Sequence, residues 1–316
     1  MVPELNDLKF IDLFAGIGGM RLAFESKGAT CVFSSEWDKY AQKTYEANFG
    51  EIPEGDITKI RATDIPKFDI LLAGFPCQPF SSIGKREGFK HKTQGTLFYD
   101  VARIIDQHKP SAFLLENVSG LLTHDDGRTF STIISTLIEL GYEVEYKILD
   151  ASDYGVPQKR ERIYIVGFNK RKVKSGAFCF PPQRKKKVGI GKYVEKDRTD
   201  LSISKHLQSV YIYKLDDGRP EVITPKSEFP VKTLVASYHK IQRLTGTFVA
   251  DGPTGLRLLS ENECKAVMGY PKSFKIPVSR TQMYRQFGNS VAVPVIKALA
   301  DAMIKHLDEY ARRSRK

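Results

Sequence analysis

The sequence predicts an α/β protein in which a doubly wound, mostly parallel sheet carries a second, smaller and irregular domain. Two observations predict this fold class. Up to about residue 168, short apolar runs alternate with amphipathic stretches, the pattern of β-α units that build a parallel sheet. From about residue 170 to 255 the chain is basic, loop-rich and interrupted by prolines, which indicates a separate irregular region.

Short apolar runs mark the expected strands of the sheet. They cover residues 9–13, 31–35, 69–73, 112–115, 144–149 and 163–168. After the first run, Met20, Ala23 and Phe24 share one face of an expected helix, and Gly28 is its expected stop. Residues 130–140 form another expected helix, which Gly141 closes.

Regular structure is expected again near the end of the chain. Ser260 and Glu263 have the spacing of a capping box, which predicts a short helix closed by Gly269. A final helix would place its apolar residues on one face: Ile296, Leu299, Met303 and Leu307. We therefore expect a sheet domain over 1–174, a second domain over 175–280, and a segment over 281–316 that returns to the sheet.

Composition bounds the class of protein. The 316 residues carry a formal charge of +12, and residues 170–198 hold eleven Lys or Arg against two acids. This favours a polyanionic partner, although a solvated basic loop would have the same composition. The four cysteines lie far apart, so we expect neither disulfides nor a metal site. No signal segment or apolar run of membrane-spanning length is evident, so we expect a cytoplasmic protein without membrane partners.

Three successive strand ends carry features of a nucleotide-type cofactor site. The first expected strand ends at Asp12 and Phe14 and runs into the glycine turn 16–19, where backbone N–H groups can approach a ligand. The second ends at Glu36, whose carboxylate can accept bonds from two ribose hydroxyls. The third unit offers Asp56 beside an apolar residue, suited to an adenine. The glycine turn alone also fits a dinucleotide or a merely structural turn.

A cysteine, a carboxyl group and an arginine belong to the same edge of the expected sheet. Cys77 stands between prolines directly after a buried strand, a setting that presents a thiol instead of burying it. Glu116 follows the next strand and is a candidate acid or base with a raised pKa. Arg160 and Arg162 alternate with Glu161, so both can point to one side of a strand.

These groups together suit alkylation of cytosine at carbon 5, a ring carbon that is not nucleophilic by itself. A thiolate that adds to carbon 6 turns carbon 5 into an enamine-like nucleophile. The step needs an acid at ring nitrogen 3, a cation at the exocyclic oxygen and an electrophilic methyl donor. The nucleophile would be Cys77, the acid Glu116 and the cation Arg162. The methyl donor would be an adenosyl sulfonium bound at the glycine turn 16–19.

The chain resembles the DNA (cytosine-5)-methyltransferase family, in particular its compact prokaryotic members. The resemblance covers the whole chain except about 175–230. It rests on nine blocks in the family's order: DLFAGIGG, EWDKYAQ, GDIT, GFPCQPFS, GTLF, ENV, QKRERIYIVG, MGYP and QFGNSV. It implies an S-adenosylmethionine-dependent methyltransferase fold, a monomer, double-stranded DNA as substrate, and the modification role in a restriction-modification system. Any cognate endonuclease would act separately, and the sequence does not encode whether one exists.

The resemblance implies roles for individual residues. Cys77 would be the nucleophile, Glu116 would engage nitrogen 3 and the amino group, Arg162 would hold the base's oxygen and Arg160 a phosphate. The S-adenosylmethionine pocket would consist of Phe14, Ile17, Gly19, Glu36, Trp37, Asp56, Ile57, Gly74, Pro76, Leu97, Asn289 and Ser290. The last two would close the pocket from the far end of the chain.

The resemblance also implies how DNA is handled. The target cytosine would be flipped out of the duplex, aided by a mobile loop over residues 81–95. Residues 175–280 would form the target-recognition domain, in which Thr233 belongs to the family's threonine-leucine pair and Gln242 is one of several polar residues that could reach base edges or phosphates. The expected DNA contacts are Gln78, Ser81, Lys85, Arg86, Thr233, Tyr238, His239, Lys240 and Arg243.

Three other readings of the sequence remain open. An RNA-methylating branch of the family shares nearly every block, but its Cys-Phe-Thr triplet is replaced here by Cys179, Phe180 and Pro181. A non-catalytic DNA-binding relative would not need Cys77, Glu116 and Arg162 together. A nicotinamide oxidoreductase would explain only the glycine turn.

Overall fold

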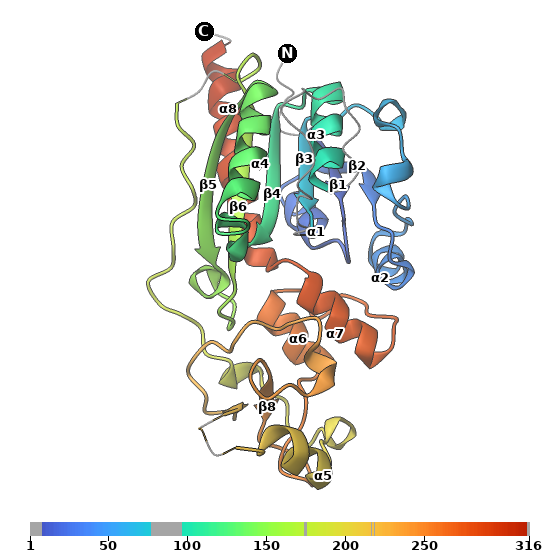
Figure 1. Cartoon of the computed structure of the whole chain (residues 1–316), viewed down its shortest axis with the longest axis vertical. Coiled ribbons are helices and arrows are strands. Elements are labelled where there is room, and N and C mark those ends of the chain that lie inside the picture. The colour runs from blue at the N-terminus through green and yellow to red at the C-terminus, as the bar shows by residue number, and fades with distance from the viewer. Residues whose placement is uncertain (1–7, 77–96, 174–175, 216, 218, 315–316) are drawn as a thin grey trace.

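The structure is a computed structural model that describes residues 8–76, 97–173, 176–215, 217 and 219–314 of the chain. Its centre is a six-stranded sheet in the order β2-β1-β3-β4-β6-β5 (Figure 1). The strands are β1 Lys9–Leu13, β2 Thr30–Ser35, β3 Ile70–Gly74, β4 Ala112–Val118, β5 Tyr142–Asp150 and β6 Glu161–Asn169. Each expected strand is present, and β4, β5 and β6 are the ones most extended beyond their expected bounds.

The sheet is mostly parallel, as predicted, with one reversed strand. β1 pairs in parallel with β2 and β3, and β3 pairs in parallel with β4, whereas β6 is antiparallel to both β4 and β5. The link between β5 and β6 spans only residues 151–160, which is shorter than the crossover that a parallel pair requires. The reversal places the start of β6 at the edge where the parallel strands end.

Two apolar layers cover the sheet because neighbouring strand residues point to opposite faces. Phe10 and Leu72 belong to the layer with α1 (Gly19–Glu25), α2 (Lys39–Phe49) and α8 (Val293–Ser314). Ile11 and Leu71 belong to the layer with α3 (Leu97–His108) and α4 (Arg128–Glu139). Both faces are thus buried, as expected for a doubly wound sheet (Figure 1).

The predicted helix boundaries are confirmed at both ends of the chain. α4 ends just before Gly141, which has φ +94°, and Gly28 follows α1 with φ +86°. Ser260 and Glu263 form the predicted capping box of α6 (Glu261–Met268), and Gly269 closes it with φ +74°. α7 (Arg280–Asn289) follows, and α8 then packs against α1, so the end of the chain returns to the sheet.

The irregular region has little regular structure of its own. It contains α5 (Lys205–Leu207) and a two-stranded parallel sheet of β7 (Glu221–Ile223) and β8 (Thr247–Val249). Short 3₁₀ or π turns over the whole chain are η2 Ile57–Lys59, η3 Ala62–Asp64, η4 Ser119–Leu122, η5 Ala151–Tyr154, η6 Gly191–Tyr193, η7 Thr199–Leu201, η8 Gln208–Ile212 and η9 Tyr238–Lys240. In Figure 1 this region lies with α6 and α7 below the sheet.

A buried ion cluster holds the irregular region to α6. The Arg257 side chain is fully buried; its guanidinium contacts both oxygens of the equally buried Glu263 at 2.8 and 2.9 Å, and its Nε lies 2.8 Å from Asp251. Arg257 also donates to the backbone carbonyl of Glu195 at 2.6 Å. Because a buried charge is tolerated only when it is paired, this cluster fixes how the irregular region meets α6.

One helical stretch of the described residues, 280–309, is long and apolar enough to span a membrane by length and composition alone. The expectation that no apolar run reaches that length is therefore wrong on this measure. Of its most apolar 18 residues, 61% are buried inside the protein. Ile296, Leu299 and Met303 of α8 are fully buried against the sheet domain, so the apolarity of this stretch is that of a core helix.

Candidate active site

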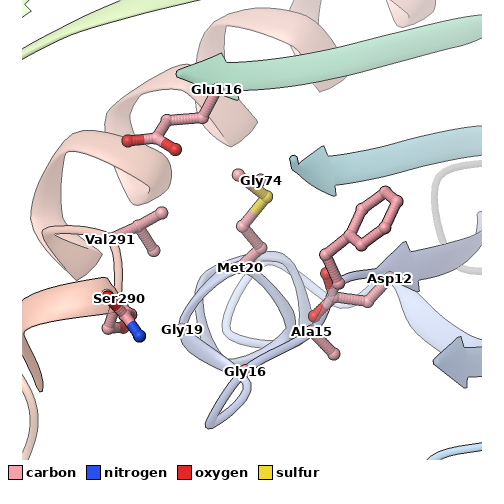
Figure 2. Close-up of a pocket in the computed structure, with 11 residues that line it drawn as sticks. Asp12, Ala15, Gly16, Gly19, Met20, Gly74, Glu116, Ser290 and Val291 are labelled. Atoms are coloured by element: carbon pink, nitrogen blue, oxygen red, sulfur yellow. The ribbon is translucent and has the colours of Figure 1, made fainter. Parts of the chain in front are cut away.

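A cavity of about 820 Å³ opens where β1, β2, β3 and β4 end, and α7 closes its far side. The cavity is lined by every residue expected in the cofactor pocket except Gly19: Phe14, Ile17, Glu36, Trp37, Asp56, Ile57, Gly74, Pro76, Leu97, Asn289 and Ser290. Gly19 lines an adjoining pocket of about 40 Å³, which shares Phe14 and Ser290 with the larger cavity (Figure 2). The volume of the larger cavity is typical of a small-molecule site.

The glycine turn is shaped by close packing. Gly18 has φ +82°, and a Cβ there would lie 2.2 Å from the ring of Phe49. A Cβ on Gly19 would lie 2.5 Å from the Tyr270 hydroxyl, which itself hydrogen-bonds Ser290 at 2.6 Å. Figure 2 shows Gly16 and Gly19 on this turn, with Ser290 opposite. Only glycine lets the turn approach both α2 and the returning segment so closely.

Glu36 is held rigidly at the end of β2. One carboxylate oxygen accepts from the Gly16 N–H and the other from the Asp38 N–H, each at 2.8 Å. Burial raises the pKa of Glu36, and these N–H groups oppose the rise. Trp37 is 77% exposed although it lines the cavity, so its ring is available to a bound group. Asp56 accepts from the Thr58 N–H and hydroxyl, which orients it at the opposite wall.

Glu116 and Arg162 meet at the centre of the site. Glu116 lies near the end of β4, and Arg162 lies at the start of the reversed strand β6, so both reach the same edge. Arg162 Nε lies 3.2 Å from Glu116 Oε1, and both side chains are largely buried. Burial raises the pKa of Glu116, while Arg162 and then Arg160 lower it. The pair also lines the cavity, as predicted.

Asn117 belongs to the ENV block, but the sequence alone indicates no role for it. Its buried side-chain amide donates to the Phe75 carbonyl at 2.9 Å, and so ties the end of β3 to β4. Phe75 and Pro76 line the cavity, so this bond fixes the direction in which the chain leaves β3 towards residue 77. A buried strand that ends in polar residues, as β4 does at Glu116 and Asn117, is the signal that could have indicated this role.

The sequence analysis expected Arg160 to bind a phosphate, but the structure directs its side chain elsewhere. Its side chain is buried and donates to three backbone carbonyls, those of Leu234, Gly288 and Ser290, at 2.6 to 3.1 Å. Burial, with Arg162 nearby, lowers the pKa of Arg160 to about 10. The physical reason is that carbonyls brought together from distant segments need a donor in a dry interior. Arg160 therefore joins the irregular region to the cavity wall.

The residues expected to contact DNA differ in whether the structure leaves their side chains accessible. Tyr238 is wrong as a DNA contact, because its ring is buried in the core and its hydroxyl bonds the Thr247 carbonyl and the Leu259 N–H. The Arg243 side chain is only 12% exposed and pairs with Asp217. Thr233 donates its hydroxyl to the Lys159 carbonyl at 2.7 Å. His239 is half-buried and Lys240 exposed. Cys77, Gln78, Ser81, Lys85 and Arg86 lie outside the described residues.

α7 supplies cavity residues to which the sequence analysis gave no role. Gln282, Arg285 and Gln286 all line the cavity. Gln286 bridges to α2, because its amide donates to the Tyr40 carbonyl at 2.8 Å and accepts from the Thr44 hydroxyl at 2.9 Å. A helix surface carries no local signal of such a partner more than 200 residues away. The one sequence hint was that Gln286 is the first residue of the QFGNSV block.

The fold and the cavity together define a methyltransferase of the doubly wound α/β class. The family model of C-5 cytosine-specific DNA methylases matches residues 8–305, so the chain belongs to this family. The expectation drawn from the nine sequence blocks is thereby confirmed.

Named relatives are similar over nearly the whole chain. The type II methyltransferase M.BsuFI of Bacillus subtilis is 61% identical over 95% of this chain and 73% of its own length. M.MspI of Moraxella sp is 58% identical over 94% of this chain and 70% of its own length. M.HhaI of Haemophilus parahaemolyticus is 43% identical over 94% of both chains.

Solved structures show the same fold. A DNMT2 variant of Spodoptera frugiperda superimposes with a TM-score of 0.77, at 23% identity, over 95% of this chain and 99% of that chain. The S. pombe Dnmt2 methyltransferase gives the same TM-score at 21% identity, over 96% of this chain and 99% of that chain. At this identity the likeness concerns the fold alone.

Proposed function

We propose that the chain methylates carbon 5 of one cytosine within a short, specific site of double-stranded DNA, with S-adenosylmethionine as the methyl donor. Membership of the C-5 cytosine-specific DNA methylase family supports the reaction. The observation that carries the proposal for the site is the buried Glu116–Arg162 pair, which faces a cavity lined by Glu36, Asp38, Asp56 and the exposed Trp37.

Glu116 and Arg162 would recognise and activate the pyrimidine. A protonated Glu116 can donate to ring nitrogen 3, and its second oxygen can accept from the exocyclic amino group. Arg162 can donate to the ring's exocyclic oxygen while it stays beside Glu116. Proton donation at nitrogen 3 neutralises the negative charge that builds up on the ring as the thiolate attacks carbon 6, which lowers the barrier to that addition.

Cys77 would be the nucleophile that adds to carbon 6. Pro76, the residue that precedes Cys77 in the sequence, lines the cavity. Addition of the thiolate forms a carbon–sulfur bond and makes carbon 5 nucleophilic. After carbon 5 is methylated, loss of its proton and elimination of the thiolate restore the ring. Since carbon 6 is shielded in a base stack, the cytosine would be flipped out.

The residues around the cavity fit S-adenosylmethionine. Glu36 keeps lone pairs on both oxygens for ribose hydroxyls, and the exposed ring of Trp37 can cover an adenine. Asp12, which is 99% buried, lines the small pocket with one carboxylate oxygen that has no partner among the described residues. That oxygen suits a cationic group. When bound, the sulfonium supplies an electrophilic methyl group.

Trp37 should report cofactor binding. It is the only tryptophan of the chain and is 77% exposed, so a bound adenine would change its fluorescence emission. We expect Glu36→Gln to raise the S-adenosylmethionine Kd measured in this way by roughly 10- to 100-fold, because hydrogen bonds to a charged group contribute about 1.5–3 kcal/mol. Glu143→Gln, an exposed position near the start of β5, is the matched control. An unchanged Kd in Glu36→Gln would contradict this role.

The function is tested by bisulfite sequencing of plasmid DNA from cells that express the chain. We expect protected cytosines at one recurring short sequence and none in cells without the gene. The sequence context of the protected cytosines identifies the recognition site. Protection of no cytosine, together with methylation of RNA, would favour the RNA-methylating alternative instead.

The biological setting follows from the relatives. Those described above are named type II methyltransferases, which supports a modification role in a restriction-modification system. We propose a cytoplasmic monomer whose cognate endonuclease acts separately. Residues 175–280 would recognise the DNA site, residues 1–174 would hold the catalytic and cofactor groups, and residues 281–316 would close the cofactor pocket.

A further inference from the structure

The loop over residues 237–246 is a tightly built turn in the irregular region. Tyr238 anchors its start in the core, and the Gly246 N–H closes it by donating to the Gln242 carbonyl at 2.8 Å. Ile241, at its tip, has φ +53°. A β-branched residue is strained in this left-handed region, and such strain persists only where the surroundings enforce one conformation. The loop is therefore held in one shape before any ligand binds.

The amide of Gln242 has a fixed direction within this loop. Its side-chain oxygen accepts from the Ser237 hydroxyl at 3.0 Å and from the Thr245 hydroxyl at 3.1 Å. Both lone pairs of that oxygen are thus engaged. Gln242 is exposed, and its NH₂ group has no partner among the described residues. The two N–H donors of the Gln242 amide therefore face solvent, whereas its oxygen is occupied within the loop.

The loop begins at the wall of the active-site cavity. Arg160 holds the Leu234 carbonyl at 3.1 Å, and a Cβ on the cavity-lining Gly288 would lie 2.1 Å from the Ala236 nitrogen. Six residues lead from Ala236 to Gln242, and a chain spans at most about 3.5 Å per residue, so Gln242 lies within roughly 20 Å of that wall. At 3.4 Å per base step this corresponds to about six base pairs.

Among the polar side chains of this loop, Gln242 is best placed to read a base, because it is exposed whereas His239 is half-buried. Tyr238 is buried, and Arg243 is held by Asp217 and by the Leu215 carbonyl. Lys240 is exposed and suits a phosphate, which fixes position without reading sequence. Of the major-groove edges, guanine alone presents two adjacent acceptors, O6 and N7, whereas adenine pairs an acceptor with a donor.

We infer that Gln242 determines sequence specificity by donating from its fixed amide to a guanine in the major groove, within about six base pairs of the target cytosine. The inference rests on the proposed methylation of DNA. Ser237 and Thr245 act as positioning residues that keep the amide from rotating to an orientation in which it would read adenine or cytosine.

The test replaces each guanine of the methylated site, one at a time, by 7-deazaguanine, which lacks the N7 acceptor. For the whole enzyme we expect kcat/KM for methyl transfer to fall about tenfold at one position. Gln242→Ala should lower kcat/KM on the unmodified site by roughly 10- to 100-fold and should lose sensitivity to 7-deazaguanine at that position. A Ser237→Ala, Thr245→Val double variant should accept adenine there more readily, at an unchanged KM for the methyl donor.

Gln107→Ala, an exposed glutamine on α3, is the matched control and should behave as the unaltered enzyme. The ratio between unmodified and 7-deazaguanine duplexes is taken within each variant, so a partly unfolded variant cannot imitate the effect. Equal ratios for Gln242→Ala and the unaltered enzyme at every guanine would overturn the inference. A chain that methylates no DNA at all would instead contradict the proposed function.

Discussion

Replacement of Cys77 by serine is expected to abolish methyl transfer, with a loss of at least about 10⁴-fold in kcat. A cysteine thiol has an ordinary pKa near 8.5, so a useful fraction is thiolate near neutral pH, whereas a serine hydroxyl is essentially un-ionised. Of the described cysteines, Cys31 has its pKa raised to about 12 by burial, and burial also raises the pKa of Cys264. Neither can replace the missing thiolate.

The covalent bond itself can be measured. A duplex with 5-fluorocytosine at the target position cannot lose its carbon-5 substituent as a proton, so the enzyme should remain attached after methylation. We expect a protein–DNA band that survives denaturing electrophoresis with the unaltered enzyme and is missing with Cys77→Ser. Cys179→Ser is the matched control, because Cys179 is the exposed thiol among the described residues. A persistent adduct in Cys77→Ser would assign the nucleophile elsewhere.

Glu116→Gln is expected to lower kcat by roughly 10²- to 10⁴-fold, the usual contribution of a positioned general acid. Glutamine keeps the shape of the side chain and can still hydrogen-bond nitrogen 3, but it cannot transfer a proton. Steady-state methylation with a tritiated methyl donor measures the loss. Glu161→Gln is the matched control, because Glu161 is exposed and precedes Arg162, whose guanidinium pairs with Glu116.

The acid role of Glu116 also predicts how kcat/KM changes with pH. Burial raises the pKa of Glu116, so its acid form persists to higher pH than that of an ordinary glutamate. Activity that depends on the acid form is present below this pKa and is lost as pH rises through it. The unaltered enzyme should show such a decline in kcat/KM, and Glu116→Gln should lack it. An identical decline in both proteins would remove Glu116 from the acid role.

Local patterns predicted most of the fold and many of the residues that line the cavity. Periodicity located the strands, and glycines marked where helices end, because both depend on neighbours a few residues apart. The acids Glu36 and Asp56 could be predicted because the ends of parallel strands converge at one edge. The reversal of β6 was missed, although the short link after β5 requires it.

Side chains whose partners lie far away in the chain could not be predicted in this way. Tyr238 is part of a polar run and resembles a surface residue, yet it is buried because Leu259 and Thr247 supply partners for its hydroxyl. The same holds for Arg160, whose three carbonyl partners come from segments 74 to 130 residues away. Burial of polar groups is decided by such distant partners, which no local pattern records.

The position of Arg160 has a thermodynamic consequence for the binding of DNA and of the methyl donor. One of its carbonyl partners, Leu234, precedes the loop over residues 237–246, for which we propose a DNA contact, and another, Ser290, lines the cavity proposed to bind the methyl donor. Any displacement of the first segment by a duplex therefore acts on the second through one guanidinium. By linkage, the factor by which DNA changes the affinity for the methyl donor equals the factor by which the donor changes the affinity for DNA, so a single cycle of binding titrations gives the strength of this cooperativity.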